Sequence, residues 1–434
     1  DLERARAAAH LADEAHAGGR SLGPLHGVPM TIKDSFQTEG CVTTSGAPDF
    51  ADFVPTEDAA PVAALRRAGA VPFAKTNLPI FADDIQSFNE IHGTTNNPHD
   101  VTRTPGGSSG GSAAALAMGF TPLEIGSDIG GSIRVPAHYS GVAGHKPSFG
   151  IVPAHGQIPG APGTLSQSDL AVTGPMARTA DDLALGLDVR SGPDRWSTPA
   201  WSLDWPEPRA EALAGFRVAA WLDDDFSPVD ADTSRVLDTM CAGIEAAGAR
   251  VDRVARPDVT LEKAFTVFGR LLFAALSGGQ PPAKIEHMAA DTADTSLGFV
   301  KRSTAMRHRA WLSDNERRQQ IRERCARFFG DVDVLLMPVH PRAAIPHDHS
   351  RPQWARRVEI GGVEHDYLDL WPWIALAGLA YLPATVIPVG VGGDGLPIGV
   401  QIVGPFLHDR TTIAFARALA EVVGGCPRPS LASD

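Results

Sequence analysis

The sequence predicts an α/β fold, in which a single large domain has a central, mixed and mostly parallel twisted sheet covered by helices on both faces. Two observations lead to this prediction. Segments with helical periodicity alternate along the chain with short apolar runs typical of strands. The 434 residues, 43% hydrophobic and 21% charged, have an ordinary globular composition, and a chain of this length can bury a large core.

Helices are expected where apolar residues recur every three to four positions. These stretches are 3–17, 58–68, 112–118, 179–187, 233–247, 261–276, 304–329 and 411–423. Strands are expected in the short apolar or alternating runs between them, which are 28–32, 71–74, 123–125, 216–221, 332–338, 384–389 and 397–403. Strands that alternate with helices favour a largely parallel or mixed sheet with both faces covered.

Two polar intervals, 191–209 and 340–357, are expected to be surface connections, and the first is rich in proline and tryptophan. Neither is long enough to mark a domain boundary, and no fixed-period repeat is visible. We therefore interpret 1–434 as one domain.

Charge and cysteine content narrow the class of partner. With 38 Lys and Arg against 51 Asp and Glu, the formal net charge is −13. An acidic surface repels phosphate backbones, and no basic run is interleaved with aromatic residues, so small molecules rather than nucleic acids are expected as partners. The four cysteines lie far apart, which predicts neither a disulfide framework nor a zinc site.

The segment 370–393 has no charged residue and is long enough to span a membrane. Pro372, Pro383 and Pro388 would interrupt such a helix repeatedly, so we expect the segment in the core. The first residues lack the basic and then apolar pattern of a signal peptide. The expectation is a cytoplasmic protein that does not use a membrane.

The densest chemical signal is the stretch 104–112, Thr-Pro-Gly-Gly-Ser-Ser-Gly-Gly-Ser, which precedes an alanine-rich helix. Glycines around Ser108 and Ser109 leave both hydroxyls unshielded, as a nucleophile turn or an anion cradle requires. A phosphate-binding P-loop would need a lysine at the end of this loop, which is absent. The nucleophile elbow of an α/β-hydrolase fits the pattern, and so does a simple helix-capping turn.

A second glycine–serine cluster spans 126–136. Here Ser132 follows Gly130 and Gly131, where successive backbone N–H groups can converge on an oxyanion. Asp128 and Arg134 flank the turn with opposite charges and are expected to brace it as an ion pair. A strand-to-helix turn with a capping serine is the alternative.

The third motif is an apolar strand, 28–32, that delivers Lys33. A lysine at the end of a strand usually points to solvent. If it is buried, desolvation lowers its pKa and makes the neutral amine a usable base. Such a base is needed, because a serine hydroxyl is too weak an acid to attack an amide unaided.

In this order and spacing, the three motifs resemble the amidase signature family, whose catalytic set is a lysine, a serine in a cis peptide and a nucleophilic serine. Ser108 follows Lys33 by 75 residues and Ser132 follows Ser108 by 24. The resemblance is strongest over a signature core, 22–185. It is weak over a variable substrate-side region, 191–330, and returns in the C-terminal strands and helix, 331–423.

The resemblance implies a serine hydrolase that cleaves C–N acyl bonds in amides, aryl amides or carbamates, as a urethanase would, through an acyl-enzyme. Neutral Lys33 would accept a proton from Ser108, which would accept one from Ser132 as its oxygen attacks. Ser109, Asp128 and Arg134 would support the site. The oxyanion would be held by the main-chain N–H groups of Ile129, Gly130, Gly131 and Ser132. No metal or organic cofactor is required, and a homodimer is left open.

Four residues are predicted to contact the substrate: Gln86, Phe88, Ile151 and Gln401. The loop 151–164, shaped by proline and glycine, is expected to form a wall or lid of the pocket. Trp371 and Trp373 are further candidates for an apolar wall, although core packing is the commoner use of tryptophan.

Other arrangements in the sequence remain open. His138 and His145 lie close enough to Ser132 in the sequence for a Ser-His-Asp triad. The run 347–349, His-Asp-His, contains metal-ligating residue types, and Cys41 follows Lys33 by eight residues. More ordinary interpretations, namely polar loop residues, a solvated loop and an unassigned thiol, are preferred for these features.

Two alternative functions also remain. One family branch is the glutamine-hydrolysing subunit of a tRNA-dependent amidotransferase, but the stretch 148–157 replaces the arginine-containing sequence expected in that branch. The other is a non-catalytic, small-molecule-binding relative. The intact set of Lys33, Ser108 and Ser132 argues against it.

Overall fold

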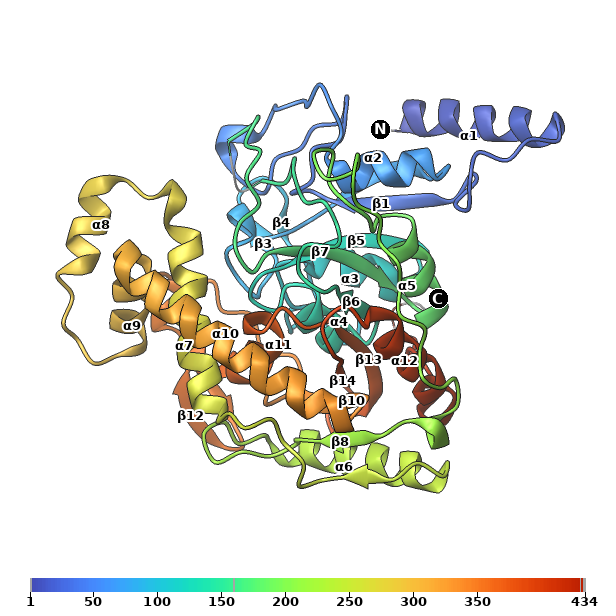
Figure 1. Ribbon diagram of the computed structural model, residues 1–434. Coiled ribbons are helices and arrows are strands. Elements are labelled where there is room, and N and C mark those ends of the chain that lie inside the picture. Colours follow the sequence, from blue (N-terminus) through green and yellow to red (C-terminus); the bar gives the residue numbers. More distant parts are fainter. Residues whose placement is uncertain (1, 159–160, 430, 432–434) are drawn as a thin grey trace.

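The computed structural model describes residues 2–158, 161–429 and 431. Its centre is an eight-stranded sheet in the order β5-β7-β6-β13-β14-β10-β8-β9 (Figure 1). The strands are, in that order, Leu123–Asp128, Val172–Ala177, Ala143–Lys146, Ala384–Val391, Pro397–Val403, Val334–Pro338, Val218–Ala220 and Val251–Asp252. The short pairs are β1 (Pro29–Lys33) with β2 (Val71–Thr76), β3 (Phe88–Asn89) with β4 (Gly93–Thr94), and β11 (Arg357–Ile360) with β12 (Val363–Asp366).

The helices follow most of the predicted periodic stretches and add several short ones. They are α1 (Leu2–Ala17), α2 (Ala60–Arg67), α3 (Gly110–Ala117), α4 (Arg134–Ser140), α5 (Ala180–Asp188), α6 (Ala231–Ala246), α7 (Leu261–Ala275), α8 (Pro282–Ala289), α9 (Ser296–Thr304), α10 (His308–Asp331), α11 (Pro372–Leu379) and α12 (Asp409–Val423). The α8 and α9 helices were not predicted, because the stretch 277–303 shows no clear apolar period.

The mixed α/β sheet is confirmed, but the expectation that most strands would pair in parallel is wrong. From β5 through β7, β6, β13 and β14 to β10, every neighbouring pair is antiparallel. Among the described residues, the parallel pairs of this sheet are β10 with β8 and β8 with β9. Alternation of helices and strands in the sequence does not distinguish a crossover from a hairpin return. The glycine-rich turn 392–395 between β13 and β14 was the missed hairpin signal.

Helices cover both faces of this sheet. On β13, Thr385 donates to Thr412 of α12, whereas the next residue, Val386, pairs with Gln401 of β14. Gln401 in turn donates to the Trp373 carbonyl oxygen of α11. Because successive side chains of a strand point to opposite faces, α12 and α11 lie on different sides. The segment 370–393 is therefore core helix and strand as predicted, and no helix among the described residues is long and apolar enough to cross a membrane.

The β1–β2 pair extends this architecture next to β5. The Thr31 hydroxyl donates to Glu124 on β5 at 2.7 Å, and so does the Thr76 hydroxyl of β2 at 2.8 Å. β2 is longer than predicted, since it includes Lys75 and Thr76, and β1 is shifted by one residue so that it includes Lys33. This shift places Lys33 inside a paired strand rather than in solvent.

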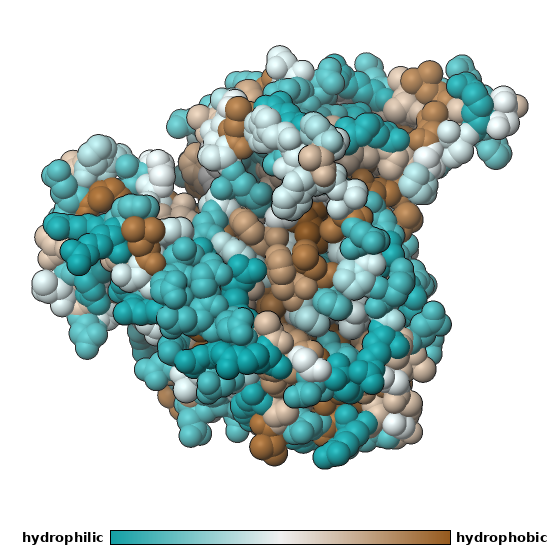
Figure 2. All heavy atoms as spheres, in the orientation of Figure 1, coloured by the Kyte–Doolittle hydropathy of each residue, from teal (hydrophilic) through white to brown (hydrophobic). Residues whose placement is uncertain are grey.

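The surface of the face seen in Figure 1 is mainly hydrophilic. Figure 2 shows hydrophobic residues gathered in a recess near its middle, between the part that carries α1 and α2 and the part that carries α10. On this face the exterior is therefore mainly polar and the recess is apolar.

Candidate active site

The amine of Lys33 is surrounded by three serine hydroxyls. Its Nζ lies 2.7 Å from the Ser108 Oγ and 2.9 Å from the Oγ atoms of Ser109 and Ser127. The side chain is fully buried. Ser108 and Ser109 precede α3 and Ser127 lies on β5, so Lys33 connects three elements of the fold.

Burial lowers the pKa of Lys33 from 10.5 to about 7, although the negative charges of Asp128 and Glu124 act in the opposite direction. A hydroxyl can accept a hydrogen bond from an ammonium or donate one to a neutral amine. The Lys33 surroundings therefore accommodate both charge states near neutral pH.

The glycine–serine loop before α3 packs too tightly for side chains at its glycines. A Cβ at Gly107 would lie 2.7 Å from the carbonyl oxygen of Asp84. At Gly106, where φ is +89°, a Cβ would lie 2.6 Å from the Pro136 Cα. The peptide bond between Gly107 and Ser108 is cis. The glycines thus serve a close approach between this loop and its neighbours.

The turn that carries Ser132 connects β5 to α4 and touches this first loop. The Ser109 N–H donates to the Ser132 carbonyl oxygen at 3.2 Å. Ser132 is 7% exposed, and its hydroxyl has no hydrogen-bond partner within the described part of the chain. The two predicted serine loops are in contact, and the hydroxyl of the predicted nucleophile is unpaired.

Asp128 and Arg134 form the ion pair that the sequence predicts, with Nη2 and Oδ1 3.0 Å apart and both side chains buried. The carboxylate also accepts the N–H groups of Gly131 at 2.9 Å and Ile133 at 3.2 Å. Burial alone would raise the pKa of Asp128, but the Arg134 guanidinium, the charge of Lys146 and the Gly131 N–H hold it at about 2. The turn is therefore braced by a permanent negative charge.

The same carboxylate corrects the predicted oxyanion site. Because the Gly131 N–H already donates to Asp128, it is not free to bind an oxyanion in this arrangement. The N–H groups of Ile129, Gly130 and Ser132 have no hydrogen-bond partner among the described residues. These three are the remaining candidate donors.

Gln401, predicted to contact substrate, instead supports Arg134. Its amide donates to the carbonyl oxygens of Pro338 at 2.8 Å and Trp373 at 2.7 Å, and its Oε1 accepts from Arg134 at 3.2 Å. The side chain is fully buried and its polar atoms are used. The substrate role is thus replaced by a structural one.

Gln86 is likewise committed within the protein. Its amide donates to the Asp348 carbonyl oxygen at 2.9 Å and to the Tyr367 hydroxyl at 3.1 Å, and its Oε1 accepts the Asp348 N–H at 3.0 Å. It joins two segments far apart in the sequence. Both N–H groups of the Gln86 amide and its Oε1 are thus used in contacts within the protein.

The predicted substrate contacts of Phe88 and Ile151 remain predictions. Phe88 is half-buried and stacks on His349, with ring centroids 3.8 Å apart, and Ile151 is buried. The predicted wall loop does contact the chain that follows Lys33, since the Ile158 N–H donates to the Ser35 carbonyl oxygen at 2.8 Å. Pro159 and Gly160 of this loop lie outside the described residues.

Ser127 and Glu124, whose charge raises the pKa of Lys33, were missed as site residues, whereas Trp371 was a candidate for the apolar wall. Ser127 stood inside the second motif, but the predicted strand ended at 125, so its place on β5 was not recognised. Trp371 lies before α11 and donates through its indole N–H to the Gly130 carbonyl oxygen at 3.1 Å. Trp373, by contrast, donates to the Ser227 carbonyl oxygen and is core. No local signal separates these two tryptophans.

The histidines near Ser132 are committed elsewhere. The His138 Nδ1 accepts the Gly399 N–H at 2.7 Å, and the two ring nitrogens of His145 contact Thr385 and Asp409. Neither histidine is hydrogen-bonded to Ser132. In the described ranges, no group of three or more His, Cys, Asp or Glu residues is placed to hold a metal ion, so the 347–349 run does not form one.

A cleft of about 720 Å³ lies between α10, the turn after α11 and the segment 405–411. Its lining includes Arg217, Arg322 and Asp333 but none of the three predicted catalytic residues. The candidate active site is therefore defined by side-chain chemistry and not by this cavity.

Comparison with known proteins gives one consistent family. The family model described as Amidase matches residues 1–413. Fatty-acid amide hydrolase 2-A of Danio rerio is 32% identical over 94% of this chain and 76% of its own length. A glutamyl-tRNA(Gln) amidotransferase subunit from Azoarcus sp. is 34% identical over 96% of this chain and 88% of its own length. A crystal structure of an amidase, 28% identical, aligns over 98% of this chain and 91% of its own, with a TM-score of 0.78.

Proposed function

The chain belongs to the amidase family of hydrolases that act on carbon–nitrogen bonds, and we propose that it cleaves amides or carbamates through an acyl-enzyme formed on Ser132. Lys33 is the base, and Ser108 relays the proton from Ser132 to Lys33. The observation that carries this proposal is the buried Lys33 amine, 2.7 Å from the Ser108 hydroxyl and with a pKa lowered to about 7.

The valences of the amine explain why three hydroxyls surround it. A neutral amine has two N–H groups and one lone pair. Ser109 and Ser127 accept the two N–H groups, which directs the lone pair to the Ser108 hydroxyl. When a proton has moved from Ser132 through Ser108, the ammonium donates to all three oxygens. Both states of the base are satisfied without a movement of the serines.

The rest of the reaction uses backbone groups and the same relay in reverse. As Ser132 attacks the carbonyl carbon, the N–H groups of Ile129, Gly130 and Ser132 stabilise the oxyanion. The relay then returns a proton to the leaving nitrogen, because an amide anion is a very poor leaving group. Water hydrolyses the acyl-enzyme.

Labelling with a fluorophosphonate tests the nucleophile. Wild type is expected to become covalently modified on the peptide that contains Ser132, and Ser132→Ala is not, with mass spectrometry as the readout. Equal labelling of the two proteins would remove Ser132 from the proposal and favour a non-catalytic binding role. A panel of p-nitroanilides, primary amides and aryl carbamates then identifies the substrate class.

Similarity to the amidotransferase of Azoarcus sp. supports a second candidate, glutamine hydrolysis within a larger complex. Fatty-acid amide hydrolase 2-A and the indoleacetamide hydrolase of Bradyrhizobium diazoefficiens, each 32% identical, support the free-standing amidase. The two are separated by whether tRNA and a co-purifying partner stimulate glutamine hydrolysis. If hydrolysis of small amides proceeds without them, the free-standing enzyme stands.

A further inference from the structure

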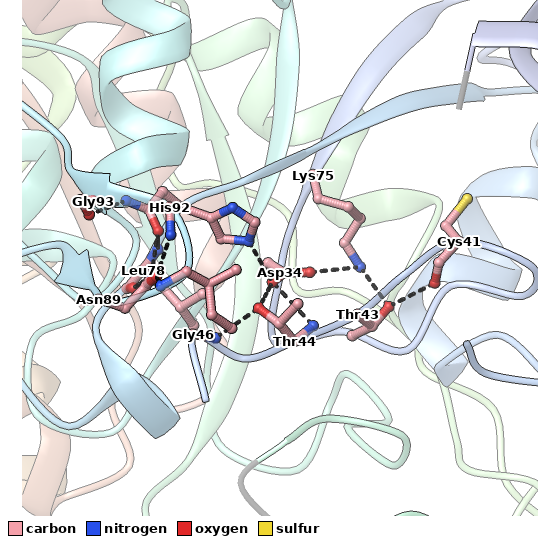
Figure 3. A network of polar contacts seen from close by, with 12 residues as sticks. Asp34, Cys41, Thr43, Thr44, Gly46, Lys75, Leu78, Asn89, His92 and Gly93 are labelled. Atoms are coloured by element: carbon pink, nitrogen blue, oxygen red, sulfur yellow. Dashed lines mark hydrogen bonds and ion pairs between the residues drawn. The ribbon is translucent and has the colours of Figure 1, made fainter. Parts of the chain in front are cut away.

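A second lysine network lies beside the active site, on the strand next to Lys33. The Lys75 cluster consists of Lys75, Asp34, Thr38, Thr43 and Thr44. The Lys75 Nζ donates to the Phe36 carbonyl oxygen at 2.6 Å and to the hydroxyls of Thr38 and Thr43 at 3.0 Å each. Figure 3 shows Asp34 between this amine and the Thr44 side chain, and its Oδ1 lies 3.7 Å from the Lys75 Nζ.

The contacts of the cluster fall on the chain that leaves β1 directly after Lys33. Asp34 follows Lys33, and its Oδ2 accepts both the backbone N–H and the hydroxyl of Thr44. The Ser45 N–H donates to the Asp34 carbonyl oxygen at 3.0 Å. The chain thus leaves the strand, turns and returns to Asp34, with Lys75 bonded to the inside of the turn.

The same turn supports the predicted wall loop. The Gln37 N–H donates to the Gly156 carbonyl oxygen at 3.0 Å, and the Ser45 hydroxyl donates to the Ile158 carbonyl oxygen at 3.3 Å. A displacement of the turn would therefore move both the end of β1 and the loop around 156–158.

From these contacts we infer that Lys75, as a cation paired with Asp34, is a positioning residue that fixes the end of β1 and so keeps the Lys33 amine within reach of Ser108. This inference rests on the proposed function. It concerns a residue that touches neither the reacting atoms nor Ser132 in the proposed reaction.

The partners of Lys75 require the charged form, unlike those of Lys33. An ammonium supplies three N–H groups, which match the Phe36 carbonyl and the two threonine hydroxyls, and its charge faces Asp34. The Thr38 and Thr43 hydroxyls already donate to the carbonyl oxygens of Phe36 and Cys41, and the remaining partners are a carbonyl and a carboxylate oxygen, which cannot donate. A neutral amine has two N–H groups and a lone pair, and that lone pair would therefore face no donor. Loss of the proton therefore removes a hydrogen bond and the ion pair together.

The titratable groups around Lys75 set where this loss occurs. Burial lowers the pKa of Lys75 from 10.5 to about 8, while Asp34, Cys41 and Glu124 act to raise it. His92 faces the opposite side of Asp34, with its Nε2 3.9 Å from Oδ2. In Figure 3 the Cys41 sulfur points away from the Lys75 amine. We expect kcat/KM to rise as Lys33 loses its proton and to fall as Lys75 loses its own.

The test is the pH profile of kcat/KM for wild type, Lys75→Met, Lys75→Arg and Asp34→Asn, with the surface variant Lys263→Met as control. Lys75→Met is expected to lower kcat about 10-fold to 100-fold at the pH optimum, with a smaller change in KM, since misplacement by about 1 Å has costs of this order. Lys75→Arg, which stays protonated, should retain activity and lose the falling limb near pH 8. Lys263→Met should match wild type.

Asp34→Asn gives a directional readout that does not depend on the fate of the Lys75 variants. The carboxylate raises the Lys75 pKa, so its removal should move the falling limb to lower pH. A falling limb that is unchanged in Asp34→Asn, or wild-type kcat in a folded Lys75→Met protein, would overturn the positioning role while leaving the proposed function intact. Failure of wild type to label at Ser132 would instead overturn the proposed function, and this inference with it.

Discussion

Two buried clusters meet at the turn of Ser132, and they are built from opposite kinds of groups. On one side, Lys33 is surrounded by hydroxyls, which suit either charge state of the amine. On the other, Asp128 and Arg134 form an ion pair whose charges are fixed, and Gln401 completes it. The Lys33 amine can gain or lose a proton, whereas the Asp128–Arg134 pair keeps its charges and fixes the backbone of the turn. The comparison separates groups that move a proton from groups that place the backbone.

The largest effect is expected at the Lys33 cluster. Lys33→Ala removes the base, so kcat should fall by about 10²-fold to 10⁴-fold, the usual contribution of general base catalysis. Steady-state hydrolysis of an activated amide measures it, with circular dichroism to confirm the fold. Wild-type kcat in the folded variant would show that the lysine takes no part in the reaction.

A substitution in the Asp128–Arg134 pair should change the stability of the fold more than the rate of the reaction. Arg134→Met leaves the Asp128 carboxylate buried and unpaired, which is expected to lower the free energy of unfolding by about 3–5 kcal/mol. Urea denaturation measures the change. The matched control is Arg235→Met, which removes an exposed ion pair to Asp232 and should cost no more than about 1 kcal/mol. Similar losses for both variants would contradict the contrast between the buried and exposed pairs.

The pH dependence sharpens the comparison, because Lys33 titrates near neutral pH and Asp128 does not. Burial lowers the pKa of Lys33 to about 7, and the reaction needs the neutral amine. Below that pKa, kcat/KM should fall about 10-fold per pH unit as the amine becomes protonated. Asp128, held at a pKa of about 2, remains charged throughout this range. An optimum below pH 6 would point to a carboxylate base instead.

How much of this site the sequence could predict depends on how local each contact is. Lys33, Ser108 and Ser132 stand in short motifs with characteristic spacing, and Asp128 and Arg134 are six residues apart. Each could be singled out from its own segment.

Other roles depend on partners that no local pattern identifies. Gln401 contacts Arg134 across 267 positions, and Gln86 contacts Asp348 across 262. The sequence marks both as polar residues in apolar surroundings, and that pattern suits a substrate contact and a buried support equally well. The directions of the strands were predicted wrongly for the same reason. A hairpin and a crossover connection can both leave helices and strands alternating along the sequence.

A smaller effect on stability is expected at Gln401, which supports the Asp128–Arg134 ion pair. Gln401→Leu leaves the carbonyl oxygens of Pro338 and Trp373 without their donor, and the free energy of unfolding should fall by about 1–3 kcal/mol. Urea denaturation measures the loss, and KM should remain close to wild type, because Gln401 is buried and its polar atoms are bonded within the protein. A large rise in KM with unchanged stability would restore the substrate role.

The smallest effect distinguishes the supporting hydroxyls from the relay itself. Ser127→Ala removes one of the three oxygens around the Lys33 amine, and a single hydrogen bond of this kind contributes about 1 kcal/mol. The ammonium loses an acceptor, so its pKa should decrease and the rising limb of kcat/KM should move to lower pH. At the same time kcat should fall by less than 10-fold, because the lone pair is no longer directed to Ser108 as strictly. Thr173→Val is the control, since Thr173 pairs with Ser127 across the strands and its buried hydroxyl has no hydrogen-bond partner among the described residues. Its profile should match wild type, and an equal shift in both variants would mean that the strand pair, and not the Ser127 hydroxyl, governs the base.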